Sequence, residues 1–152
     1  MTGSAADRSV RVVVASLLVT MVALTAGCGS SSSDTEDLTL SLRETRTAVR
    51  SVELALDLLD QGRTTRAAAQ VTAGDMVDQI GLAQQRLADA PGDTEELRDL
   101  RRRCQVVVSD SLVAVQDTED ALSTTDGGAG VGADLPQVQS AVDATLTDVG
   151  ER

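Results

Sequence analysis

The sequence predicts an all-α protein, a small antiparallel bundle of four helices, three long and one short, preceded by a signal peptide and a tether. Apolar residues recur at steps of three and four after residue 38, as they do on one face of a helix. Phe, Tyr and Trp are absent, so the core must consist of small aliphatic side chains, which suit close helix packing. Breaker residues separate the periodic stretches, and short connections favour antiparallel neighbours.

The first expected helix begins at Leu38. Ser33 or Thr35 can cap its start, and Gly62 lies just after its end, where a left-handed residue often closes a helix. Its apolar seam has the spacing of a heptad repeat. The seam residues are Leu38, Leu42, Thr45, Val49, Val52, Leu56 and Leu59.

The second expected helix runs from about Thr65 to Ala90 and stops at Pro91-Gly92. Its seam residues are Ala69, Ala73, Met76, Ile80, Ala83, Leu87 and Ala90. Asp93 and Glu96 then form the pattern of a capping box, from which a third helix continues to about Ser123. The seam of this third helix consists of Leu97, Leu100, Cys104, Val108, Leu112, Val115 and Leu122.

A glycine-rich loop at residues 124–134 precedes the last expected helix, which restarts at Asp134 and Pro136 and ends at Gly150. Its apolar face consists of Leu135, Val138, Val142, Leu146 and Val149. Because this helix is short, two other arrangements stay open. One is a three-helix bundle with a loose tail, and the other is an elongated helical hairpin that dimerises.

The charge and composition exclude several function classes. The 13 cationic residues are all Arg and face 24 acidic residues, which gives a net charge of −11. Such a chain is repelled by nucleic acid, so we expect no nucleic-acid binding. There is no His, and no GxGxxG, P-loop or CxxC pattern occurs. We therefore expect no catalytic residues, no metal, no cofactor and no enzyme activity.

The N-terminal segment has the layout of an export signal. Arg8 and Arg11 precede an uncharged run at residues 12–26, which is too short for a membrane span of roughly 20 residues. The run ends in LTAGC, in which the small residues Ala26 and Gly27 directly precede Cys28.

This pattern resembles the lipobox of bacterial prolipoproteins. The resemblance covers residues 1–28 and implies that Cys28 receives a lipid and that a peptidase recognises Leu24, Thr25, Ala26 and Gly27 before it cuts. Thr25 stands where Leu is commonest in the family, with Leu24 one place earlier. An ordinary signal peptide and an uncleaved anchor are the rival interpretations.

The expected division of the chain is a signal peptide at 1–27, a lipidated Cys28 with a flexible tether at 28–37, and a helical domain at 38–150. The segment from Gly29 to Asp37 reads GSSSSDTED, which cannot bury apolar surface. A flexible stretch of about nine residues reaches roughly 15–18 Å, enough to hold a domain clear of lipid headgroups.

Three features of the domain are candidates for function. Cys104 lies on an apolar seam, so we expect a buried thiol, and an intermolecular disulfide or a reactive thiol is the alternative. Small residues recur every seven positions on the second helix, at Ala67, Gly74, Gly81 and Ala88. They indicate close internal packing or a groove for a partner helix. A basic run at Arg98, Arg101, Arg102 and Arg103 indicates surface ion pairs or docking of an anionic partner.

These observations predict a lipoprotein at the extracytoplasmic face of the bacterial cell membrane. It would be anchored through acylated Cys28 and would act as a non-catalytic interaction module. The expected partner is another protein or a second copy of the chain. The candidate partner contacts are Gly74, Gly81, Arg101, Arg102 and Arg103. A carrier of a small apolar ligand is the first alternative, and an enzyme is a remote one.

Overall fold

The computed structural model describes residues 30–90, 93–124 and 130–150. By its internal contacts the chain divides into two compact units, residues 1–33 and residues 34–152. The described residues form four α-helices and no strand, as the sequence predicted. The helices are α2 (Ser30–Asp60), α3 (Arg66–Asp89), α4 (Glu95–Ser123) and α5 (Leu135–Gly150).

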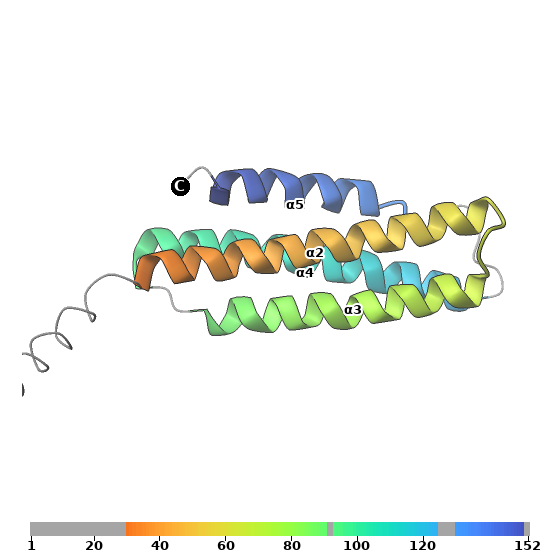
Figure 1. Cartoon of the computed structure of the whole chain (residues 1–152), viewed down its shortest axis with the longest axis horizontal. Coiled ribbons are helices and arrows are strands. Elements are labelled where there is room, and N and C mark those ends of the chain that lie inside the picture. Colours follow the sequence, from red (N-terminus) through yellow and green to blue (C-terminus); the bar gives the residue numbers. More distant parts are fainter. Residues whose placement is uncertain (1–29, 91–92, 125–129, 151–152) are drawn as a thin grey trace, which may run out of the picture. The chain divides into compact units, whose positions relative to one another are not determined.

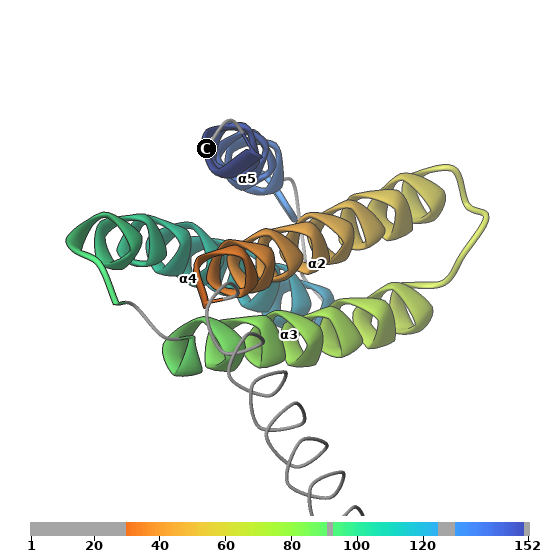
Figure 2. The same ribbon diagram turned by 60° about the vertical axis from the view of Figure 1, so that its left-hand side comes forward.

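The helices of the second unit alternate in direction along the chain, which the colours of Figure 1 allow the reader to follow. α4 packs against both α3 and α5. In both views α3 and α5 lie on opposite sides of α2 and α4 (Figures 1 and 2). The fourth helix of the sequence analysis is therefore packed on the bundle and is not a loose tail.

The core follows the predicted seams and contains small aliphatic side chains throughout. Its largest fully buried apolar residues are Leu42, Ile80, Leu87, Leu135 and several valines. Leu56, Leu59, Met76, Leu112, Val138 and Leu146 pack against this core while partly exposed. Each of the expected helices thus buries the face that its apolar spacing predicted.

The core also contains hydroxyl side chains that the apolar pattern did not identify. Ser111 and Thr118 on α4 are buried. The apolar spacing had placed Leu112, the neighbour of Ser111, on the seam. Their hydroxyls donate to the carbonyls of Val107 and Ala114, one turn earlier, at 2.8 Å each. Because each hydroxyl is satisfied within its own helix, it can enter the core at little cost.

Two connections show why the helices end where they do. Gly62 has a φ of +67°, and its N–H donates to the Leu59 carbonyl while that of Arg63 donates to the Leu58 carbonyl. This is a Schellman motif, and its left-handed residue is the glycine that the sequence predicted. Thr65 then caps α3, because its side chain accepts from the Ala68 N–H.

The start of α4 differs from the predicted capping box. The N-cap is Thr94, whose hydroxyl accepts from the Leu97 N–H at 3.2 Å, so the expected cap by Asp93 with Glu96 is wrong. The helix begins one residue later than that box requires. Glu95 and Glu96 instead lie in the first turn, where their charges favour the N-terminal end of the helix dipole.

The predicted flexible tether is also corrected. α2 begins at Ser30, so residues 30–37 are helical and neither Ser33 nor Thr35 is the N-cap. Once Leu38 and Leu42 are anchored in the core, extending the helix backwards needs no new nucleation. Serine costs only a fraction of a kcal/mol relative to alanine in a helix, roughly 0.5 kcal/mol. Among the described helices, none has the length and hydropathy required to cross a membrane.

Candidate functional site

The residues of the predicted lipidation site lie outside the described part of the chain. They are Cys28 and the recognition residues Leu24, Thr25, Ala26 and Gly27. Their lipidation and recognition therefore stay predictions. The remaining candidates all lie on α3 and α4 and can be located.

Cys104 is a core residue, as predicted. Its side chain is fully buried on the inner face of α4, one turn from Leu100 and one turn from Val108. Burial raises the pKa of the thiol to about 11, although the charge of nearby Arg103 acts in the opposite direction. At neutral pH the sulfur is thus a protonated thiol shielded from solvent, and neither a reactive thiolate nor an intermolecular disulfide fits this position.

The small residues of α3 do not form one continuous contact. A Cβ added to Gly74 would come within 3.2 Å of Glu119 Oε1, at the flexible end of a side chain of α4, so Gly74 leaves room for this carboxylate. A Cβ added to Gly81 would meet nothing within 4 Å. Neither glycine therefore requires a close approach of the two helix backbones, and Gly81 lies on an open groove.

The members of the arginine run contact different groups, although Arg102 and Arg103 also line one surface hollow together with Glu96 and Asp99. Arg101 donates to the carbonyl of Ala90 at the end of α3, Arg102 pairs with Asp99 one turn earlier, and Arg103 lies 3.0 Å from Asp148 on α5. Consecutive helical residues are about 100° apart, which explains the different contacts. The structure confirms the expected surface ion pairs, and it brings Arg102 alone of the three beside Gly81.

Gly81 and Arg102 lie on the same groove between α3 and α4, which has a volume of about 690 Å³. Its walls are mostly small or polar, and Val106 is the large apolar residue among them. The lining residues are Gly81, Gln84, Gln85, Ala88, Arg102, Gln105, Val106, Ser109 and Asp110. The groove is a surface hollow, so it does not match the enclosed dry cavity that a carrier of an apolar ligand would need.

A second, smaller groove of about 280 Å³ lies on the other side of α4, against α5. It contains Val113 together with Asp110, Asp117 and Asp134. The outer face of α4 carries four residues that we call the α4 stripe: Arg102 and Val106, which line the first groove, and Val113 and Asp117, which line the second. Val106 and Val113 are 54% and 52% exposed, whereas Leu54, Val71 and Leu82 on α2 and α3 are exposed to a greater extent.

The sequence analysis missed Val106, Val113 and Asp117. Residues 106–108 read as a run of three valines, of which only Val108 was assigned to the seam. The signal that could have identified the others is their spacing. Val106 and Val113 are one heptad apart and fall on the helix face opposite to the seam, so a second apolar stripe was present.

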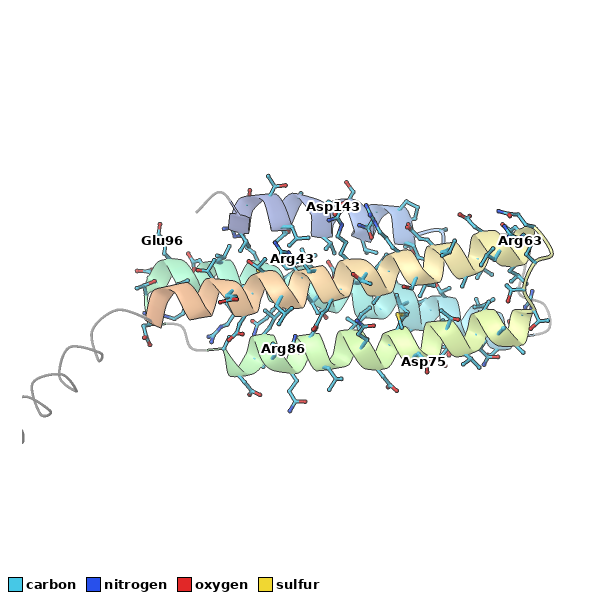
Figure 3. All side chains as sticks on the ribbon, in the orientation of Figure 1. Arg43, Arg63, Asp75, Arg86, Glu96 and Asp143 are labelled. Atoms are coloured by element: carbon cyan, nitrogen blue, oxygen red, sulfur yellow. The ribbon has the colours of Figure 1, made fainter. Side chains whose placement is uncertain are left out.

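Ion pairs link α2 to its neighbours α3 and α5 through Arg86 and Asp143, which Figure 3 labels. Arg86 of α3 lies 2.5 Å from Glu44 of α2. Asp143 of α5 lies 2.8 Å from Nε of Arg46 and 3.8 Å from Arg50, and it accepts a hydrogen bond from Gln139. The contact between Arg46 and Asp143 is an ion pair without a hydrogen bond. Because the paired side chains are partly exposed, these ion pairs contribute little to the stability of the bundle.

No group of three or more acidic, His or Cys side chains within residues 30–90, 93–124 and 130–150 could hold a metal ion. Comparison with known protein families, with curated proteins and with solved structures finds no match to the chain.

Proposed function

We propose that the protein is a bacterial lipoprotein that acts at the extracytoplasmic face of the cell membrane as a non-catalytic, protein-binding module. The observation that carries this proposal is the LTAGC sequence at the end of the uncharged run 12–26, which resembles a lipobox. A lipid on Cys28 would fix the location of the chain, and a second acyl chain would make the anchoring stable.

The α4 stripe supports the binding role. Valine side chains that are more than half exposed lose water-exposed apolar area when a partner covers them, which favours association. The two grooves that these valines line offer recesses for partner side chains. A protein fits this surface better than a small ligand, because the apolar groups lie in open surface hollows that do not enclose a ligand.

The anchoring proposal is tested by substitution of Cys28. In cells that process lipoproteins, intact mass should show a diacylated or triacylated N-terminal cysteine on the native chain. Cys28→Ala should abolish both the lipid and the cut at this position. Cys104→Ala is the matched control, because it removes the other thiol and should leave lipidation unchanged. An unmodified N-terminus further downstream on the native chain would contradict the proposal.

The binding proposal is tested by a photo-crosslinking side chain at position 106 in intact membranes. We expect an adduct with the mass of a protein. The same side chain at position 71 is the control, because Val71 is 64% exposed but lies on α3, away from the α4 stripe. Equal yields at the two positions, or adducts with lipid alone at position 106, would contradict a specific protein-binding face.

A further inference from the structure

We propose that α5 covers, from within the chain, a docking surface that receives an amphipathic helix of a partner protein when α5 detaches. We call it the α5 docking surface, the part of α2 and α4 bounded by Arg46 and Arg50 on α2 and by Arg103 and Asp117 on α4. The inference rests on the proposed binding function, because it names a second surface for that function and the kind of partner that fits it.

α5 contacts the bundle from one side only. It packs against α4 and forms ion pairs with α2, and in both views α3 lies on the far side of these two helices (Figures 1 and 2). α3 buries a seam of its own, in which Ile80 and Leu87 are fully buried. We therefore expect α2, α3 and α4 to keep a shared core when α5 leaves.

The apolar contacts of α5 have the pattern of a ligand helix. Its buried residues are Leu135, Val142 and Val149, and Val138 and Leu146 pack against the core while partly exposed. These positions follow one another at steps of three and four residues, so they lie on one face of the helix. Peptide helices that dock on proteins use the same spacing.

Both carboxylates of α5 are matched by arginines of the docking surface. Asp143 lies 2.8 Å from Nε of Arg46 and 3.8 Å from Arg50 on α2, and Asp148 lies 3.0 Å from Arg103 on α4. The two carboxylates flank the apolar face on opposite sides, because each helical residue turns by about 100°. The second half of α5 thus lies between arginines, in a chain with a net charge of −11.

The first half of α5 lacks such a match. There α4 presents Asp110 and Asp117, which line the smaller groove together with Asp134 and with Gln137 of α5. Residues 130–150 contain no Arg or Lys that could offset these three carboxylates. A helix with a cation at the position of Gln137 would gain an attraction that α5 does not have.

This mismatch distinguishes a foreign helix from α5 of a second copy. A tethered helix is favoured by its high effective concentration, so a competing helix must make better contacts to replace it. α5 of a second copy would bring the same mismatch and no gain. The expected partner is therefore another protein, whose helix has an apolar face of this spacing, a cation in its first half and carboxylates in its second half.

The first test releases α5 in the full chain with Cys28→Ser. Val142→Asp places a charge on the buried face of α5, and Ala144→Asp adds the same charge on its exposed face. The anisotropy of a fluorescent peptide with the sequence of residues 133–150 measures binding. Val142→Asp should bind this peptide about tenfold more tightly than Ala144→Asp, because its docking surface is vacant. A peptide that itself carries Val142→Asp should not bind.

Far-UV circular dichroism accompanies the binding measurement. The Val142→Asp chain should lose no more helix than α5 contains, and it should still unfold cooperatively in urea. Loss of cooperative unfolding would overturn the inference, because α5 would then be inseparable from the other helices. Equal peptide binding by the two variants would overturn it as well.

The second test improves the occupant and uses the Val142→Asp chain throughout. A peptide with Gln137→Arg should bind about threefold more tightly than the native peptide, because its cation lies beside Asp110 and Asp117. Ser140→Arg, on the exposed face, is the control peptide. The gain should disappear when Asp110→Asn and Asp117→Asn are introduced together in the chain. No gain, or an equal gain for both peptides, would overturn the proposed charge pattern.

The third test seeks the partner in isolated membranes, with a photo-crosslinking side chain at position 50. We expect severalfold more protein adduct in the Val142→Asp chain than in the Ala144→Asp chain, and the added peptide of residues 133–150 should suppress it. No protein adduct, an adduct that the peptide leaves unchanged, or an adduct with a second copy would overturn the assignment. Crosslinking at position 106 tests the proposed function separately, because Val106 lies in the groove against α3. If position 106 gives its adduct while position 50 gives none, the inference fails and the binding module remains.

Discussion

α3 and α5 pack against the same helix, α4, but they differ in how many apolar side chains they bury. α3 is 24 residues long and buries an apolar seam of Ala69, Ala73, Ile80, Ala83 and Leu87. α5 is 16 residues long and fully buries only Leu135, Val142 and Val149 among its described residues. It adds ion pairs at both sides, through Asp143 to α2 and through Asp148 to α4.

The difference predicts that the bundle does not open uniformly. Buried apolar area supplies most of the free energy that holds a helix in place, whereas half-exposed ion pairs contribute little. α5 should therefore detach before α3 does, and loss of α3 should coincide with global unfolding.

The largest effect is expected on the α3 side. Leu87→Ala removes a fully buried side chain and leaves a cavity, so it should lower the free energy of unfolding by roughly 2–5 kcal/mol. Urea unfolding followed by far-UV circular dichroism measures this, since the chain has no aromatic residue for fluorescence. Leu82→Ala is the control, because Leu82 is 63% exposed on the same helix. Equal losses in the two variants would contradict the assignment of the α3 seam.

A second effect probes the core around Cys104 of α4, the helix that α3 and α5 both contact. The pKa of its thiol is about 11 in the folded protein and about 9.0 without burial. The neutral thiol therefore stabilises the fold below pH 9, and this contribution is lost as the pH rises through 11, by about 2–3 kcal/mol in total.

This alkaline loss is unusually easy to assign, because the chain has neither Lys nor Tyr to titrate in the same range. In the full chain with Cys28→Ser, unfolding free energies should fall between pH 9 and pH 11. The same chain with Cys104→Ala should give a nearly flat profile. A parallel decline in both would show that another group is responsible.

A smaller effect is expected on the α5 side. Val142→Ala removes part of one of its few fully buried side chains and should cost about 1.5 kcal/mol. Hydrogen exchange would localise the change. The amides of residues 135–150 should exchange faster, while those of α3 keep their rates. Equally faster amide exchange in α3 would mean that the two helices open together. That result would contradict the expected detachment of α5 before α3.

The smallest effect concerns the ion pairs of α5. Asp143→Asn should cost about 0.5 kcal/mol, because its partners Arg46 and Arg50 are substantially exposed. Asp148→Asn, which removes a single and more exposed pair, should cost less. Thermal melts in low and high salt would compare the two variants. High salt should reduce the difference between their melting temperatures. A larger loss for Asp148→Asn would contradict the importance given to the Asp143 cluster.

Much of the fold could be predicted because helical periodicity is a local signal. The seam residues, the left-handed Gly62 and the restart of a helix after Asp134 depend on neighbours a few positions away. The start of α2 could not be predicted in the same way. Serine-rich segments favour coil on their own, and only anchoring at Leu38 and Leu42 shows that the helix extends backwards through residues 30–37.

The candidate site was harder to predict because it depends on neighbours distant in sequence. Gly74 and Gly81 look alike in the sequence, and only the path of α4 places one beside the Glu119 side chain and the other on a groove. Arg101, Arg102 and Arg103 are adjacent in the chain but contact groups of three different segments: Ala90, Asp99 and Asp148. Sequence shows which side chains are present, whereas helix packing decides which of them share a surface.

The hydroxyl groups of the core have one further consequence. The hydroxyls of Thr45, Ser111 and Thr118 all donate to a carbonyl of their own helix, and that of Ser41 has no partner among the described residues. None of these four hydroxyls forms a hydrogen bond to another helix. The axial register of the seam is therefore set by the sizes of its small side chains and not by hydrogen bonds from these hydroxyls. Thr118→Val keeps that size, and so should leave the register of the bundle unchanged.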